Sequence, residues 1–180
     1  GLENTDITTN ERGAIVVNDT CESSVPGVYA VGDVNGGPQF TYISLDDFRI
    51  VFGALTGNGH YTLKDRKNIP YTTFLTPPLA RVGLTEEDAI NKGYTVKTKE
   101  MLVATMPRAH VNDNLKGAFK IVVDAESNLI LGATLYSQSA EELINMIKVA
   151  MDNNIPYTYF KNQIFTHPTM AENLNDLCNF

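Results

Sequence analysis

The fold is decided by residues 117–154, "GAFKIVVDAESNLILGATLYSQSAEELINMIKVAMDNN". Two runs rich in apolar and β-branched residues, 117–124 and 129–137, are joined by the turn sequence "AESN", which predicts a β-hairpin. The following stretch, 139–154, repeats apolar residues at helical spacing. Its apolar face consists of Ala140, Leu143, Ile144, Ile147 and Met151. A hairpin followed by a helix predicts an α+β fold, in which helices cover one face of an antiparallel sheet.

The segments on either side of this stretch supply further strands and helices. Residues 71–84 read as strands interrupted by two prolines, and residues 94–104 as a further strand region. Between them, residues 85–93 predict a short helix with Thr85 as its N-cap and an acidic first turn. Ser139 and Glu142 have the spacing of a capping box at the start of the longer helix. About 115 residues suffice for a core of this kind.

The first third of the chain has a different pattern of predicted strands and helices. Residues 13–19 and 27–34 are short β-rich runs, and residues 40–59 predict a helix that ends at glycines. The apolar face of this helix is formed by Leu45, Phe48, Val51, Phe52 and Leu55. Two strands and one helix cannot close a core, because each element must bury a face against another layer. We therefore expect a partial domain over residues 1–65 and a complete one over 66–180.

Composition and charge exclude several classes of function. With 43% hydrophobic and 19% charged residues, the 180-residue chain has the composition of a globular protein. A net charge of −7 and 14 scattered basic residues argue against nucleic acid and anionic membranes as partners. No apolar run is long enough to span a bilayer, and residues 1–10 lack the features of a signal peptide, so we expect a cytoplasmic protein. Cys21 and Cys178 are too far apart for a CxxC site and are expected to be reduced and unpaired.

The C-terminal sequence "THPTMAE" allows two interpretations. Thr169 and Glu172 have the spacing of a capping box, which would make His167 an incidental residue before a helix. Alternatively, Glu172 could bond to one ring nitrogen of His167 and fix the tautomer of a general acid–base group. The residues by themselves leave both interpretations open.

A second candidate site lies in "YAVGDVNGG", where an apolar run ends at Gly32 and Asp33 before a helix that starts near Thr41. Ligands of open α/β sheets bind at such strand ends, where Asp33 could accept hydrogen bonds from ligand hydroxyls. The N–H groups from Thr41 to Ile43 could stabilise an electron-rich ligand edge. Alternatively, Asp33 could simply close an Asx turn.

Several motifs, in the same order over nearly the whole chain, resemble one enzyme family. They include "VPGVYAVGDV", "FLTPPLARVGLTE", "AEELINMIKVAM" and "HPTMAE". Together they resemble the C-terminal part of the flavin-dependent pyridine nucleotide–disulfide oxidoreductases. Within that family, "GDVNGGPQFTYISLDDFRIV" and "MPRAHVND" are most similar to the branch of reactive-chlorine resistance and hypothiocyanous acid reductases, near the mercuric reductases.

The resemblance implies a role for each part of the chain. Residues 1–65 would be the end of an FAD domain, and residues 66–180 a dimerisation domain. Asp33, in its Gly–Asp motif with Gly32, would bond a ribityl hydroxyl of FAD. The helix start at Phe40, Thr41, Tyr42 and Ile43 would face the flavin pyrimidine edge. His167 would be the acid–base residue that acts in the active site of the other subunit, and Glu172 would orient it.

The chain also departs from the family pattern. It contains neither the redox pair of cysteines four apart nor the GxGxxG loops for FAD and NAD(P)H. We therefore expect a fragment of a larger NAD(P)H:disulfide reductase that acts on a small oxidant or disulfide, with no metal site in this chain. By itself the fragment should be inactive and flavin-free. The alternative is a module that only dimerises.

We also expect a homodimer, because the second region has more apolar side chains than one sheet face requires. The residues behind this expectation are Ile144, Ile147, Met151, Tyr157, Phe160 and Phe165.

Overall fold

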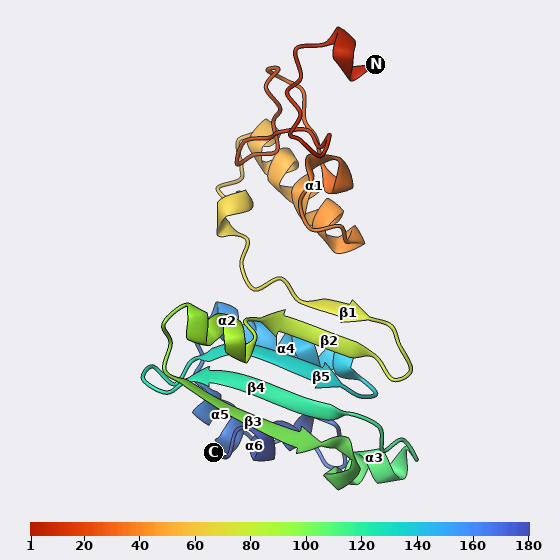
Figure 1. Cartoon of the computed structure of the whole chain (residues 1–180), viewed down its shortest axis with the longest axis vertical. Helices are drawn as coiled ribbons and strands as arrows, with labels where there is room; N and C mark the ends of the chain where they lie inside the picture. The colour runs from red at the N-terminus through yellow and green to blue at the C-terminus, as the bar shows by residue number, and fades with distance from the viewer. The chain divides into compact units, whose positions relative to one another are not determined.

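The computed structural model describes all 180 residues, Gly1–Phe180, as two compact units. The first unit is Gly1–Lys67 and the second is Asn68–Phe180 (Figure 1). A membrane-crossing helix would have to be longer and more apolar than any helix of this chain.

The second unit is built on a five-stranded antiparallel sheet in the order β1-β2-β5-β4-β3. Its strands are β1 (Tyr71–Thr73), β2 (Leu79–Gly83), β3 (Val96–Leu102), β4 (Ala118–Asp124) and β5 (Ile130–Tyr136). Its helices are α2 (Glu86–Asn91), η4 (Val103–Thr105), α3 (Pro107–Val111), α4 (Ala140–Asp152), α5 (Tyr157–Asn162), η5 (Ala171–Asn173) and α6 (Leu174–Leu177). The predicted hairpin is confirmed as β4 and β5, and the predicted α+β class is confirmed with it.

One hydrophobic core lies between this sheet and its helices. Helix α4 packs on β5 and β2, and α6 packs on β3 and β4, so these helices share one face of the sheet (Figure 1). The predicted apolar face of α4 is buried against the sheet, as the helical spacing indicated. The short helix α2 lies in front of the sheet in Figure 1, and its Ala89 is buried outside the main core.

Two predictions about the second unit are wrong. Ser139 does not form a capping box with Glu142, because its backbone is left-handed (φ +65°), whereas a capping serine needs an extended backbone. The apolar surplus assigned to a dimer contact is also absent, because those side chains lie in or against the unit's own core. Five of them are buried and the sixth is partly buried: Ile144, Ile147, Met151, Tyr157, Phe160 and Phe165.

The first unit is dominated by one long helix and by loops. Its elements are η1 (Leu2–Asn4), η2 (Gly32–Asn35), α1 (Thr41–Thr56) and η3 (Leu63–Asp65). Residues 13–19 and 27–34 do not form the predicted strands: each run contributes a single isolated bridge, Thr9 to Ile15 and Glu22 to Tyr29. A strand needs a continuous ladder of partners, and these runs find one paired position each.

Helix α1 buries the opposite side from the one its sequence indicates. Its buried residues are Ile43, Asp47 and Ile50, which are four and three apart. The predicted face is mostly exposed, with Phe48 and Phe52 in ring contact on the surface. The buried side was missed because the aspartate in its centre interrupts the apolar pattern.

Candidate active-site residues

His167 and Glu172 meet at the C-terminal end of the second unit. His167 lies in the segment between α5 and η5, and Glu172 lies within η5. The Nδ1 atom of His167 is 2.7 Å from Oε2 of Glu172. The His167 side chain is 67% exposed, so the ring is held on one side and open to solvent on the other.

Glu172 uses its second oxygen for the capping box. Its Oε1 accepts the N–H of Thr169 at 2.9 Å, and its own N–H donates to Thr169 Oγ1 at 3.2 Å. The apolar residues Met170 and Leu174 are buried beside this turn and hold it on the core. The two interpretations of the sequence therefore coexist, since one carboxylate serves both the helix start and the histidine.

The bond to Glu172 determines the tautomer of His167. An ionised carboxylate only accepts hydrogen bonds, so Nδ1 must carry a proton and Nε2 is the atom left for other chemistry. Burial raises the pKa of Glu172, but hydrogen bonds from His167 and from the Thr169 N–H lower it, and its net pKa lies below the ordinary value. The His167–Pro168 peptide bond is cis.

The second candidate site begins at the turn η2, which carries Gly32 and Asp33. Gly32 has φ +71°, and a Cβ at this position would lie 2.6 Å from Oγ of Ser44 on α1. The left-handed backbone therefore favours glycine here, and the turn packs closely on the helix. The Asp33 side chain is exposed and takes part in no hydrogen bond or ion pair within the chain, so it does not close an Asx turn.

Asp47 fixes this turn, and its role could not be deduced from the sequence. Its side chain is fully buried, and its Oδ2 accepts the Gly32 N–H at 2.7 Å and the Asn35 Nδ2 at 2.9 Å. Its other oxygen pairs with the guanidinium of Arg66, which also binds Asp46 at 2.7 Å. The position of Asp47 between Ile43 and Ile50 at helical spacing signals its burial, but it does not identify its partners.

The start of α1 contributes the remaining predicted residues. The rings of Phe40 and Tyr42 stack with centroids 5.1 Å apart, and Thr41 is exposed at the first turn. Ile43 instead buries its side chain, and its N–H donates to the Phe40 carbonyl at 2.9 Å. The Ile43 N–H is therefore already used within the first turn.

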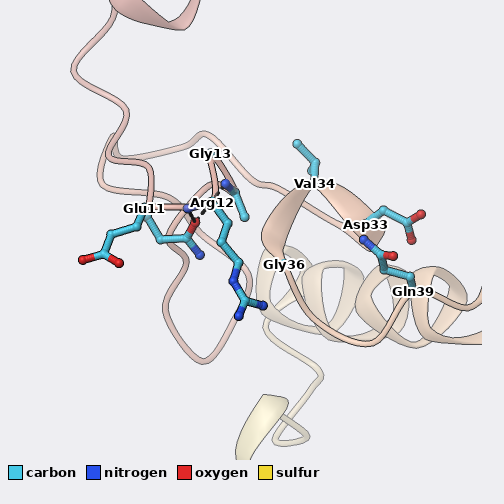
Figure 2. A pocket seen from close by; sticks show the side chains of 9 residues that line it. Glu11, Arg12, Gly13, Asp33, Val34, Gly36 and Gln39 are labelled. Atoms are coloured by element: carbon cyan, nitrogen blue, oxygen red, sulfur yellow. Dashed lines mark hydrogen bonds between the residues drawn. The ribbon is translucent and has the colours of Figure 1, made fainter.

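A pocket opens beside Asp33. It is lined by residues 10–14 from one turn and by Asp33, Val34, Gly36 and Gln39 from another (Figure 2). Asn10 shapes the first turn, since its Oδ1 accepts the N–H groups of Arg12 and Ala14 at 2.9 and 3.0 Å. The lining carries two acidic residues, Glu11 and Asp33, and one basic residue, Arg12.

Two family models match this chain. One, described as pyridine nucleotide-disulphide oxidoreductase, dimerisation domain, matches residues 69–178, and one described as pyridine nucleotide-disulphide oxidoreductase matches residues 1–47. The chain belongs to the pyridine nucleotide-disulphide oxidoreductase family. The resemblance found in the sequence is thereby confirmed.

Relatives within this oxidoreductase family agree with that membership. The chain is 49% identical over 175 residues to a probable pyridine nucleotide-disulfide oxidoreductase, RclA, of Escherichia coli, covering 97% of this chain and 40% of the relative. It is 34% identical over 173 residues to a mercuric reductase of Staphylococcus aureus, covering 96% and 31%. The structure of the HOCl-induced flavoprotein disulfide reductase RclA from Escherichia coli superposes with a TM-score of 0.95 at 47% identity, covering 98% and 41%. The chain thus spans less than half the length of these relatives.

Proposed function

We propose that this chain is part of a flavin-dependent NAD(P)H:disulfide oxidoreductase, to which it supplies the dimer interface and an acid–base histidine. The observation that carries the proposal is the 2.7 Å bond between His167 Nδ1 and Glu172, which leaves Nε2 exposed. Membership of the oxidoreductase family supports it. In this proposal the unit Gly1–Lys67 is the end of the FAD domain, and Asn68–Phe180 is the dimerisation domain.

The chemistry assigned to His167 is proton transfer at Nε2. With Glu172 holding Nδ1, the ring accepts a proton at Nε2 from a thiol and returns it to a leaving group. The carboxylate also stabilises the imidazolium that forms in between. A positioned acid–base group of this kind contributes roughly 10²–10⁴-fold to the rate.

The first unit fits a flavin cofactor. The Asp33 carboxylate projects from a rigid turn without an internal partner, as a group that binds ligand hydroxyls should. Gly32 allows the turn to lie close to α1, and the first turn of that helix would face the electron-rich flavin edge. The proposed cofactor-binding residues are Gly32, Asp33, Phe40, Thr41 and Tyr42. Ile43 is not retained, because its side chain is buried and its N–H donates to the Phe40 carbonyl. When bound, FAD supplies the electron transfer between NAD(P)H and a disulfide.

We further propose that the reductase is a homodimer and that His167 serves the active site of the partner subunit. Apolar side chains are exposed on α5 and in the segment before His167: Tyr159 is 52% exposed and Ile164 is 91% exposed. An isoleucine three residues before the histidine and almost wholly in water is typical of a surface that another chain covers. Sedimentation of the 180-residue chain at micromolar concentration should give the mass of a dimer, and Ile164→Lys should lower that mass.

The proposed substrate is a small-molecule oxidant or a disulfide. The name of the solved relative, an HOCl-induced flavoprotein disulfide reductase, supports this class. The test is steady-state turnover of the full-length reductase with His167→Ala, which should lower kcat by about 10²–10⁴-fold. Glu172→Gln should cost less, because the ring stays in place but loses its anchor.

His110→Ala is the matched control for this test. His110 is an exposed histidine of the same unit whose Nε2 bonds to a backbone carbonyl, that of Ala104, at 2.8 Å. Its loss should leave kcat unchanged. Equal activity of the His167 and His110 variants would show that His167 is an incidental residue beside the helix cap.

A dimerisation module without ligand binding is the second candidate, because Asn68–Phe180 has a complete core of its own. Titration of FAD with the full-length protein separates the two candidates. Stoichiometric quenching of flavin fluorescence supports the reductase, and no quenching supports the module.

A further inference from the structure

The segment that carries His167 has no regular structure of its own. Residues 163–170 lie between α5 and η5 outside any helix or strand. At its end, Thr169 is bonded to Glu172, and Thr169 Oγ1 donates to the Thr166 carbonyl at 2.8 Å. In its middle, Phe165 packs against the core. The start of the segment, directly after α5, has a separate anchor.

That anchor is the side chain of Asn175 on α6. Its Nδ2 donates to the Phe160 carbonyl at 2.7 Å and to the Gln163 carbonyl at 2.9 Å, with a longer contact of 3.4 Å to Lys161. These carbonyls belong to the last turn of α5 and to the first residue of the segment. One amide therefore joins the end of α5 to α6.

Asn175 and Glu172 are three residues apart, which places them on neighbouring positions of one helical turn. Glu172 holds the segment at His167 and Thr169, whereas Asn175 holds it at Gln163. Both ends of the segment are thus bonded to the same short stretch of helix.

We propose that Asn175 is a positioning residue for the acid–base histidine: through its amide it sets where the His167 segment begins relative to Glu172. This inference rests on the role of His167 proposed above. An amide that merely capped α5 would affect stability alone. A positioning residue also affects the His167–Glu172 hydrogen bond, which a capping role leaves unchanged.

The test is an NMR titration of the 180-residue chain, with ¹³C-labelled glutamate for the Glu172 carboxyl and ¹⁵N-labelled histidine for Nδ1 of His167. His167→Ala defines complete loss of the pair and should shift the Glu172 titration upward. Asn175→Ala should shift it part of the way in the same direction and change the Nδ1 signal. Asn175→Gln, which keeps the donor on a longer arm, should restore part of the wild-type signal.

Asn153→Ala is the matched control. The Asn153 Nδ2 donates at 2.8 Å to a carbonyl at the end of its own helix, that of Val149, far along the chain from the pair. It should lower thermal stability without moving either signal. If Asn175→Ala behaves like this control, Asn175 is only a cap and the proposal is overturned. If Asn175→Ala unfolds the chain, Asn175→Ser is judged by the same two outcomes, because its hydroxyl is too short to reach both carbonyls.

Failure of this inference can be distinguished from failure of the proposed function. Signals that move in Asn175→Ala, combined with normal turnover of full-length His167→Ala, would retain the positioning role and reject the catalytic one. Signals that stay, combined with slow His167→Ala, would do the reverse.

Discussion

Replacement of Asp47 by alanine should loosen the turn that presents Asp33. The Asp47 carboxylate is fully buried and accepts hydrogen bonds from the Gly32 N–H and the Asn35 side chain. It also pairs with Arg66, whose side chain is only 10% exposed. The substitution removes all three interactions at once and leaves a buried donor at Gly32 without an acceptor.

The magnitude follows from these partners. Removal of one member of a buried ion pair costs about 3–5 kcal/mol. Arg66 retains its 2.7 Å bond to Asp46, so the loss of the Asp47–Arg66 ion pair should cost less than that range. The unpaired Gly32 N–H adds roughly 1–3 kcal/mol. We expect the Gly1–Lys67 unit to lose about 3 kcal/mol of unfolding free energy.

Hydrogen exchange of the Gly32 amide is the assay. A loss of this size corresponds to about 100-fold faster exchange, since each 1.4 kcal/mol is a factor of ten. Asp46→Ala is the control, because it removes a carboxylate from the same Arg66 without touching the turn. Equal protection of Gly32 in the Asp47 and Asp46 variants would refute the reasoning.

Three further predictions concern stability and reactivity. Gly117→Ala should destabilise the second unit by about 3 kcal/mol or more in urea unfolding. Gly117 has φ +119°, and a Cβ there would lie 1.7 Å from the Tyr136 carbonyl oxygen of β5. A loss under about 1 kcal/mol would contradict this. Burial raises the pKa of Cys21 to about 11 and that of Cys178 to about 12, so a thiol reagent at pH 8 should modify neither before unfolding. Because the folded-state pKa of Glu172 lies below its unfolded value of about 4.3, its stabilisation is present above that pH and is lost as the pH falls through the folded pKa. The stability gap between wild type and Glu172→Gln should therefore shrink in acid, and a gap that is constant from pH 7 to about pH 3 would contradict the assignment.

Local patterns predicted the second unit well. The hairpin, the apolar face of α4 and the cap of α2 by Thr85 all depend on residues close in sequence, so period and turn chemistry suffice. The same holds for the His167–Glu172 contact, which spans five residues. The sequence predicts both interpretations of that motif, but only the structure shows that the Glu172 carboxylate bonds to the histidine and caps the helix at once.

Contacts between distant segments could not be predicted. Asp47 is buried because Gly32 and Arg66, 15 and 19 residues away, supply its partners, and no local pattern encodes that meeting. The hydrogen bonds of the Asn175 anchor likewise reach carbonyls 12 to 15 residues earlier in the chain. Buried polar groups are retained when partners satisfy them, so their burial follows from tertiary structure and not from hydropathy.

The most direct test of His167 as an acid–base group is a stopped-flow comparison of the two half-reactions in the full-length reductase. In His167→Ala, flavin reduction by NAD(P)H should keep its rate, whereas reoxidation of the enzyme thiols by substrate should slow by about 10²–10⁴-fold. Thiol reoxidation at the wild-type rate, or an equal loss in both half-reactions, would contradict the account.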